Sequence, residues 1–170
     1  IKNPKTLSTY NPHPAETEPS HTLLRFPFQI DGRDIALGID EERVNRKEPA
    51  GKPHAPLYVF DVTDPTKMEL LYTHHVPEEG APYTGNDVRF GAHQFREKFD
   101  DTLTYVTWFA AGLRILDIAN PSAPEEVGYF IPEPGEGYNS PLTNDVEMDH
   151  RGLLYITDKA RGFDVIDFKR

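Results

Sequence analysis

The sequence contains no cysteine, which excludes disulfide bonds and thiolate chemistry. It leaves an extracellular location open, because a large β-fold needs no disulfide. No run of apolar residues is long enough to cross a membrane. Basic residues are in the minority, with 18 Lys and Arg against 28 Asp and Glu and a net charge of −10. Because this charge disfavours contact with phosphate backbones, we expect no nucleic acid partner.

Familiar signatures of enzymes are also missing. The chain has no Gly-x-Ser-x-Gly nucleophile elbow, no phosphate-binding glycine loop and no His-Glu-x-x-His zinc motif. Hydrophobic residues make up only 37%, and 16 prolines and 12 glycines interrupt the chain. No stretch keeps a helical period. This composition predicts short strands and long loops with almost no α-helix.

What the sequence does contain is a repeat. Residues 57–65 (LYVFDVTDP) and 113–121 (LRILDIANP) align on Asp61 and Asp117, and a third, degenerate copy (FDVIDF) lies at 163–168. A period of roughly 50 residues with several short β-type segments is typical of radially repeated β-architectures. We therefore predict an all-β fold, a β-propeller made of four-stranded antiparallel blades, with about three blades present.

Each unit divides into short segments rich in Val, Ile, Tyr, Phe and Thr and bounded by Gly, Pro, Asn or Asp. Residues 1–20 hold four prolines and are expected to form an extended lead-in. The blades are expected at residues 21–77, 86–132 and 143–170. The expected strands are 22–30, 34–40, 57–62, 68–76, 86–95, 102–109, 112–119, 125–132, 144–149, 153–157 and 162–168.

Three blades do not close a ring, and repeats expose their flanking faces unless neighbours cover them. We therefore expect this chain to be part of a larger propeller. The alternative is an open array of three sheets that meets a partner or its own copy. The first residue is Ile1 rather than Met, so we expect a signal peptide or an upstream domain before the visible start.

Residues 112–130 (GLRILDIANPSAPEEVGYF) resemble the LVIVD repeat. Residues 57–71 are a looser copy, in which Lys67-Met68 replace the usual Ala-Pro, and residues 152–168 resemble the closing portion of such chains. The resemblance implies a bacterial or archaeal β-propeller with a secreted or periplasmic location. It implies no particular activity, because proteins with this repeat share none.

The repeated aspartates are tempting as catalytic or metal-binding groups. Asp61, Asp117 and Asp167 each end an apolar strand, and the first two precede tight turns that contain proline. A carboxylate at such a position accepts hydrogen bonds from the backbone N–H groups of the turn. We therefore interpret these residues as architectural.

The connections between the expected strands differ in length on the two faces of the blades. In an up-and-down blade the turns alternate between the two ends, and the long connections 41–56, 78–85 and 133–143 all fall at one end. Long connections concentrate where a rigid scaffold positions functional residues. We call this end the long-loop face and predict that it carries the function.

Two of these connections end alike, each delivering an Asn-Asp pair to the start of an inner strand near the central channel. Such oxygens suit a hard cation or the hydroxyls of a polar ligand. They equally suit capping of the strands, and both interpretations stay open. Nearby tyrosines would add flat apolar surface. The candidate ligand-binding residues are Tyr83, Asn86, Asp87, Tyr138, Asn144 and Asp145.

Among the seven histidines, His21 begins the first inner strand and His93 lies on the second. Both are candidate metal ligands at the channel mouth, although a ring-like site would need further ligands from blades that are not present here. The other interpretation is that they are ordinary core or surface histidines.

These observations favour an exported propeller that binds a protein partner or a small polar ligand on its long-loop face. The alternative is a propeller enzyme with a metal or acid–base site at the channel mouth, formed by His21, His93, Asp87 and Asp145, with a metal ion as cofactor. No catalytic residue is assigned, and whether the protein is an enzyme stays open. A further expected partner is another chain or the rest of the same propeller.

Overall fold

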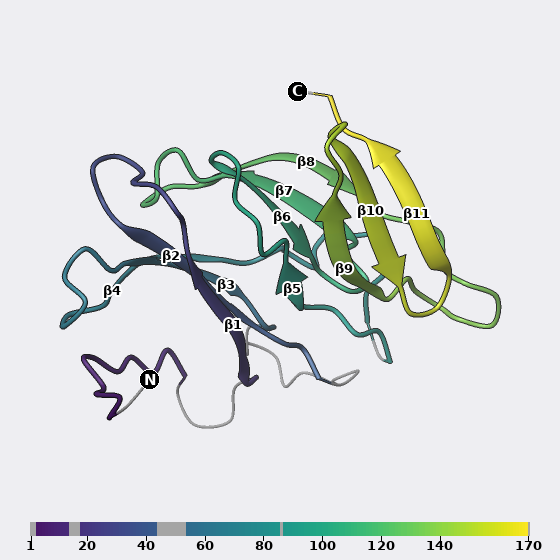
Figure 1. The fold of residues 1–170 in the computed structure, drawn as a ribbon. Helices are drawn as coiled ribbons and strands as arrows, with labels where there is room; N and C mark the ends of the chain where they lie inside the picture. Colours follow the sequence, from purple (N-terminus) through teal and green to yellow (C-terminus); the bar gives the residue numbers. More distant parts are fainter. Residues whose placement is uncertain (1–2, 14–17, 44–53, 86, 170) are drawn as a thin grey trace.

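The structure is a computed structural model that describes residues 3–13, 18–43, 54–85 and 87–169. Within these ranges the chain forms eleven β-strands and no helix. The strands make three antiparallel sheets (Figure 1). The predicted all-β class with blade-like sheets is thereby confirmed. No helix in the described ranges is long and apolar enough to cross a membrane.

Each sheet is a meander in which neighbouring strands follow one another in the chain. The first two sheets have four strands, and the third has three. The first sheet contains β1 (Ser20–Arg25), β2 (Ile35–Asp40), β3 (Leu57–Asp61) and β4 (Glu69–His74); the second contains β5 (Gln94–Phe95), β6 (Leu103–Thr107), β7 (Leu113–Asp117) and β8 (Glu125–Phe130); the third contains β9 (Thr143–Met148), β10 (Leu153–Asp158) and β11 (Gly162–Asp167).

The predicted inner strand 86–95 is wrong for most of its length, because β5 has only two residues. The preceding segment bonds to the first sheet's connections instead of to a ladder. Ala92 N donates to Ala55 O at 2.9 Å, and Ala92 O accepts from Glu42 N at 2.9 Å. These long-range bonds satisfy the backbone polar groups that a strand would otherwise pair.

The sheets are held together by two apolar cores. The main core lies between the first and second sheets and includes the fully buried Trp108 and Phe90. The second core joins Leu113 and Ile115 of β7 to Leu154 of β10. Burial of each large side chain contributes about 1.5–3 kcal/mol, so neighbouring sheets stabilise one another as the blades of a propeller do.

The turn aspartates have the predicted architectural role. Asp61 Oδ1 accepts a hydrogen bond from Thr63 N at 2.9 Å, and Asp117 Oδ1 accepts one from Ala119 N at 3.0 Å. In both cases the aspartate side chain forms an Asx turn, which fixes the backbone directly after the strand. The third repeated aspartate, Asp167, lies 3.0 Å from the Lys169 ammonium.

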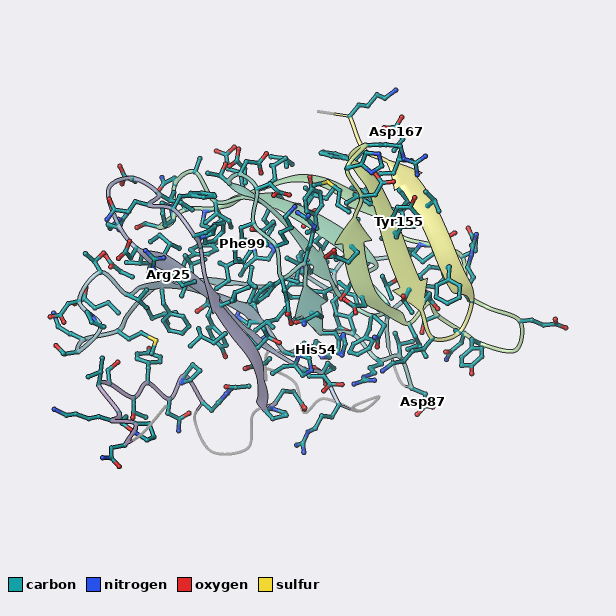
Figure 2. The ribbon with its side chains drawn as sticks, in the orientation of Figure 1. Arg25, His54, Asp87, Phe99, Tyr155 and Asp167 are labelled. Carbon is teal, nitrogen blue, oxygen red and sulfur yellow. The ribbon has the colours of Figure 1, made fainter. Side chains whose placement is uncertain are left out.

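The long connections gather toward one side of the molecule (Figure 1). Figure 2 shows His54 and Asp87 near this side and Asp167 at the opposite end. Most of the connection 41–56 lies outside the described residues. The long-loop face of the structure therefore consists of the described part of this connection and of the connections after β4 and β8.

The two outermost sheet faces differ. The outer face of the first sheet carries a small cluster that includes Phe60, and Tyr10 of the lead-in packs edge-on against Phe60 with ring centroids 5.2 Å apart. The outer face of the third sheet exposes Phe163, Val165 and Tyr155.

Candidate functional site

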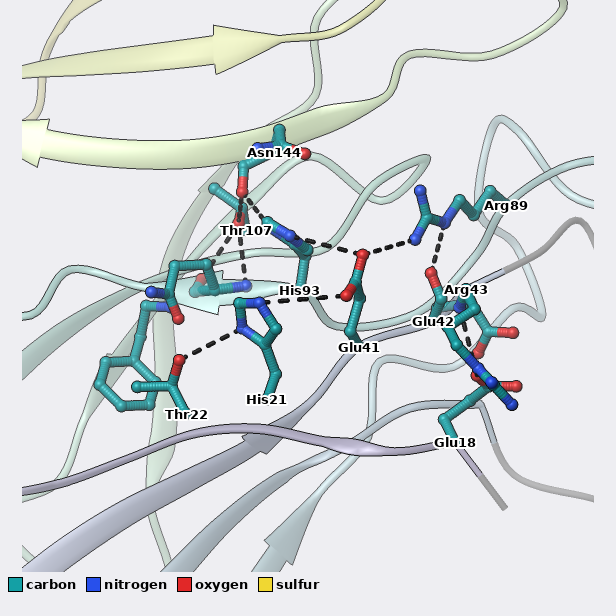
Figure 3. A network of polar contacts seen from close by, with 12 residues as sticks. Glu18, His21, Thr22, Glu41, Glu42, Arg43, Arg89, His93, Thr107 and Asn144 are labelled. Carbon is teal, nitrogen blue, oxygen red and sulfur yellow. Dashed lines mark hydrogen bonds and ion pairs between the residues drawn. The ribbon is translucent and has the colours of Figure 1, made fainter. Parts of the chain in front are cut away.

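Three potential metal ligands converge on the long-loop face, at the start of β1, the end of β2 and the start of β5 (Figure 3). His21 Nε2 lies 3.9 Å from Glu41 Oε2, and His93 Nε2 lies 3.7 Å from Glu41 Oε1. One ligand atom from each residue can be chosen so that all lie within 4.8 Å of one another. Within the described ranges, this is the one group of three or more such residues that comes this close.

Backbone hydrogen bonds place Glu41 between the two histidines. Its N–H donates to Pro19 O at 3.0 Å, which ties the end of β2 to the segment just before His21. The next residue, Glu42, donates its N–H to Ala92 O at 2.9 Å, beside His93. The site is therefore built by backbone contacts between segments far apart in the sequence.

A β-bulge re-aims the His21 side chain. In the β1–β2 ladder Ser20 pairs with Asp40 and Thr22 pairs with Ile39, so that His21 is the extra residue. An inserted residue bends the strand and changes the direction of its side chain. Here the imidazole comes to lie beside His93, with ring centroids 4.9 Å apart.

The remaining ring nitrogens are held by other groups. His93 Nδ1 donates its proton to the backbone carbonyl of Asn144, which leaves Nε2 with a lone pair directed at Glu41. His21 Nδ1 lies 3.2 Å from Thr22 Oγ1, an oxygen that can accept its proton. Outer partners of this kind orient metal-binding histidines and fix their tautomer.

His93 is suited to remain neutral. Burial lowers the pKa of its imidazole below the usual 6.5, although the Asn144 carbonyl and Glu41 oppose this shift. A histidine must be deprotonated at one nitrogen to bind a metal ion. The buried position of His93 therefore favours the form that a metal requires.

One arginine side chain pairs with the Glu41 carboxylate. Arg89 Nη2 lies 2.9 Å from Glu41 Oε1, and Arg89 Nε donates to the Glu42 carbonyl. The guanidinium also stacks 3.7 Å above the Phe109 ring centroid. Arg89 thus orients Glu41 and at the same time competes with any cation for its oxygen.

The structure brings some of the site residues predicted from the sequence together and leaves others outside the cluster. It brings His21 and His93 together, as the channel-mouth hypothesis requires. Asn144 takes part through its backbone carbonyl, while its side-chain Oδ1 is buried and has no hydrogen-bond partner. Sequence reasoning missed Glu41. The available signal was its position: it is the first residue of a long connection, directly after the strand expected to pair with that of His21.

The other described candidate residues are not part of this three-residue group. Tyr83 Oη donates to Glu133 Oε2 at 3.0 Å and so links two connections, and burial, aided by Glu133, raises the pKa of Tyr83. Tyr138 is 52% exposed. Asp87 is exposed with a φ of 66°, and Asp145 is exposed on β9. Asn86 lies outside the described residues.

A second polar cluster lies beside the first. His54 Nδ1 is 3.3 Å from the fully buried Glu42, and His54 Nε2 is 3.4 Å from Glu78. Burial lowers the pKa of His54, but the two carboxylates outweigh it and the net shift is upward. When protonated, His54 forms ion pairs with both carboxylates.

Stacked antiparallel meanders with repeated aspartate turns define an all-β repeat protein of the β-propeller type. The family model of the LVIVD repeat matches residues 103–131, which span β6, β7 and β8. The chain therefore contains an LVIVD repeat, and the resemblance is confirmed over that stretch. A comparison with curated proteins finds no match.

Proposed function

We propose that this propeller-type chain binds a divalent transition-metal ion on its long-loop face, through His21, Glu41 and His93. The observation that carries the proposal is the convergence of two imidazole nitrogens and one carboxylate oxygen within 4.8 Å. The orientation of His93 by the Asn144 carbonyl supports it. Two imidazoles and a carboxylate suit zinc and other late first-row ions better than calcium or magnesium.

The spacing of the cluster is close to what a metal needs. Tetrahedral zinc with bonds near 2.0–2.1 Å separates its ligand atoms by roughly 3.3 Å. His93 Nε2 lies 3.7 Å from Glu41 Oε1 and His21 Nε2 lies 3.9 Å from Glu41 Oε2, and one ligand atom from each residue lies within 4.8 Å of the others. These separations exceed the tetrahedral value by up to about 1.5 Å, and metal binding requires side-chain rotations that close this gap.

Three protein ligands leave at least one coordination position for an outside group. We infer that a polar ligand or a protein partner reaches the ion from the long-loop face, where Tyr83 and Tyr138 offer aromatic surface. The LVIVD repeat supports the further proposal that the protein is exported to the periplasm or the cell exterior.

Equilibrium dialysis against Zn²⁺ and Co²⁺, followed by elemental analysis, tests the metal site. We expect one equivalent of metal per chain, and a Co²⁺ absorption spectrum typical of nitrogen and oxygen ligands. His93→Ala and Glu41→Gln should each weaken binding by at least about tenfold, as loss of a ligand does. His150→Ala, which removes an exposed histidine in the turn between β9 and β10, should bind as the wild type does. Unchanged stoichiometry and affinity in the first two variants would overturn the proposal.

The open coordination position also favours a second candidate, a metal-dependent hydrolase. A bound ion lowers the pKa of its water and so supplies a nucleophile at neutral pH. Hydrolysis of p-nitrophenyl acetate by the zinc-loaded chain should then exceed that of the metal-free chain. The excess should vanish in His93→Ala and persist in His150→Ala; equal rates in all four samples would exclude this candidate for that ester.

A further inference from the structure

A pocket, separate from the metal-ligand cluster, lies on the outer face of the first sheet, on the side covered by the lead-in. Aromatic rings of Tyr10, Tyr58 and Phe60 line it, together with the exposed side chain of Leu23. Tyr10 comes from the lead-in, and the other three residues come from β1 and β3. The pocket therefore lies between two parts of the chain, is partly open to solvent and has mainly apolar walls.

A buried carboxylate lines the same pocket. Asp40, at the end of β2, is only 1% exposed. Tyr58 Oη donates a hydrogen bond to its Oδ2 at 2.8 Å, whereas its Oδ1 has no hydrogen-bond partner. An acceptor left unpaired in an apolar setting destabilises the fold, so this oxygen needs an explanation.

The nearest histidine does not satisfy it. His13 Nε2 lies 3.4 Å from Asp40 Oδ1, beyond a normal hydrogen bond. The same nitrogen lies 2.9 Å from Ser20 Oγ, which is the closer partner. Asp40 therefore lines the pocket with a buried carboxylate oxygen that has no hydrogen-bond partner, and a displacement of the His13 ring would give a donor in the pocket access to it.

We propose that this pocket binds a small organic ammonium ion with an aromatic or alkyl body, whose N–H donates to Asp40 Oδ1. The carboxylate supplies the strong, charge-assisted acceptor for such a donor. The faces of Tyr10, Tyr58 and Phe60 attract a positive charge and bury the apolar body. The net charge of −10 on the whole chain favours the approach of a cation.

Other ligand classes fit less well. An anion would meet the Asp40 carboxylate at close range, and a purely apolar ligand would leave Oδ1 unpaired and further desolvated. The proposal does not rest on the metal site. Although His21 also borders this pocket, neither Glu41 nor His93 lines it, and the two sites can be tested separately.

Isothermal titration calorimetry with three ligands of similar shape tests the proposal. The ligands are 2-phenylethylammonium, the neutral 2-phenylethanol and the anionic 3-phenylpropanoate, each with a chelator present to empty any metal site. We expect the ammonium ion to bind at least about tenfold more tightly than the alcohol, since it alone forms a charged hydrogen bond. The carboxylate ligand should not bind.

Asp40→Asn is the decisive variant, because its amide oxygen can still accept from Tyr58 while the negative charge is lost. We expect it to lose the preference for the ammonium ion over the alcohol. Glu125→Gln, which removes an exposed carboxylate on β8, should bind as the wild type does. Tyr10→Ala is a second variant, and it changes the lead-in rather than the sheet. It should weaken binding of the ammonium ion, and it keeps the test possible if Asp40→Asn does not fold.

Equal affinity for the ammonium ion and the alcohol, or no binding of either, would overturn the proposal. So would an unchanged ammonium preference in a folded Asp40→Asn chain. A parallel titration without chelator completes the test: binding seen only in that titration would assign the ligand to the metal site instead, which also contradicts the proposal.

Discussion

At the scale of single residues, the surroundings of each histidine decide its role. His74 on β4 packs edge-on against Trp108, with ring centroids 5.7 Å apart. Burial, aided by the neighbouring His75 and Arg114, lowers its pKa from the usual 6.5 to about 4. By contrast, His54 lies between two carboxylates that raise its pKa. Residue type alone therefore predicts neither the charge nor the function of these side chains.

The depressed pKa of His74 makes stability depend on pH. The folded chain keeps His74 neutral down to about pH 4, whereas in the unfolded chain this histidine binds a proton near pH 6.5. Its contribution is therefore fully present above pH 6.5 and is lost as the pH falls from 6.5 toward 4. The full effect is about 3 kcal/mol at 1.36 kcal/mol per pKa unit.

Urea unfolding at several pH values measures this effect against His74→Gln, which cannot titrate. The free energy of unfolding of the wild type should fall more steeply between pH 6.5 and 4 than that of the variant. Parallel curves for the two proteins would show that His74 is not held neutral by burial.

Asp117 provides a second prediction at this scale. Its Oδ1 accepts hydrogen bonds from Ala119 N at 3.0 Å and from Thr102 Oγ1 at 2.7 Å. Asp117→Ala leaves these donors unpaired and should cost about 1–3 kcal/mol of stability. Metal affinity should stay unchanged, because the residue lies in a turn away from His93. Thermal unfolding and dialysis of the same variant check both parts; a loss of metal binding in the folded variant would contradict the architectural role.

At the scale of elements, the site depends on how closely two connections approach. Gly91 lies against Glu42, and a Cβ atom built on Gly91 would be 2.6 Å from Glu42 Cβ. Real Cβ atoms do not come that close, so the segment before β5 must move in Gly91→Ala. Since this segment carries His93, we expect the variant to lose at least about tenfold in metal affinity as well as stability.

A matched control is Gly152→Ala in the turn between β9 and β10. Gly152 has a φ of 83° and open space around it, so an alanine there costs about 1–2 kcal/mol through backbone strain alone. Its metal affinity should equal that of the wild type. If the two variants bind metal equally well, the approach of the two connections does not position the site.

The elements also show how far the sequence could be read. The repeated strands and aspartate turns were predictable, because alternation, β-branched residues and proline turns are local signals. The segment before β5 was not, since its backbone hydrogen bonds go to Ala55 and Glu42 in the connection between β2 and β3. The role of Glu41 was not predictable either, because it lies near His93 only as a result of these long-range hydrogen bonds. The pairing of His21 with His93 was predictable from the repeat, which aligns the inner strands.

At the scale of the whole molecule, the two outer faces carry different surfaces. The lead-in places Tyr10 over the first sheet, while the third sheet turns Phe163 and Val165 outward at 84% and 60% exposure, beside Tyr155. Within the described residues, β11 pairs only with β10 and forms the edge of its sheet. Exposed apolar groups next to an open edge favour association with another sheet.

We therefore expect residues 1–170, expressed alone, to self-associate through the third sheet, because its exposed apolar face can pack against a second copy. Sedimentation velocity should show a concentration-dependent shift from monomer to larger species. Phe163→Ser combined with Val165→Thr keeps the β11 backbone and removes most of the exposed apolar surface, so it should move the equilibrium toward monomer. Leu7→Ser, an exposed apolar residue of the lead-in that is 55% exposed, is the control and should leave the association unchanged. A wild-type chain that stays monomeric at every concentration would contradict this prediction. It would show that the exposed apolar side chains of the third sheet do not cause self-association.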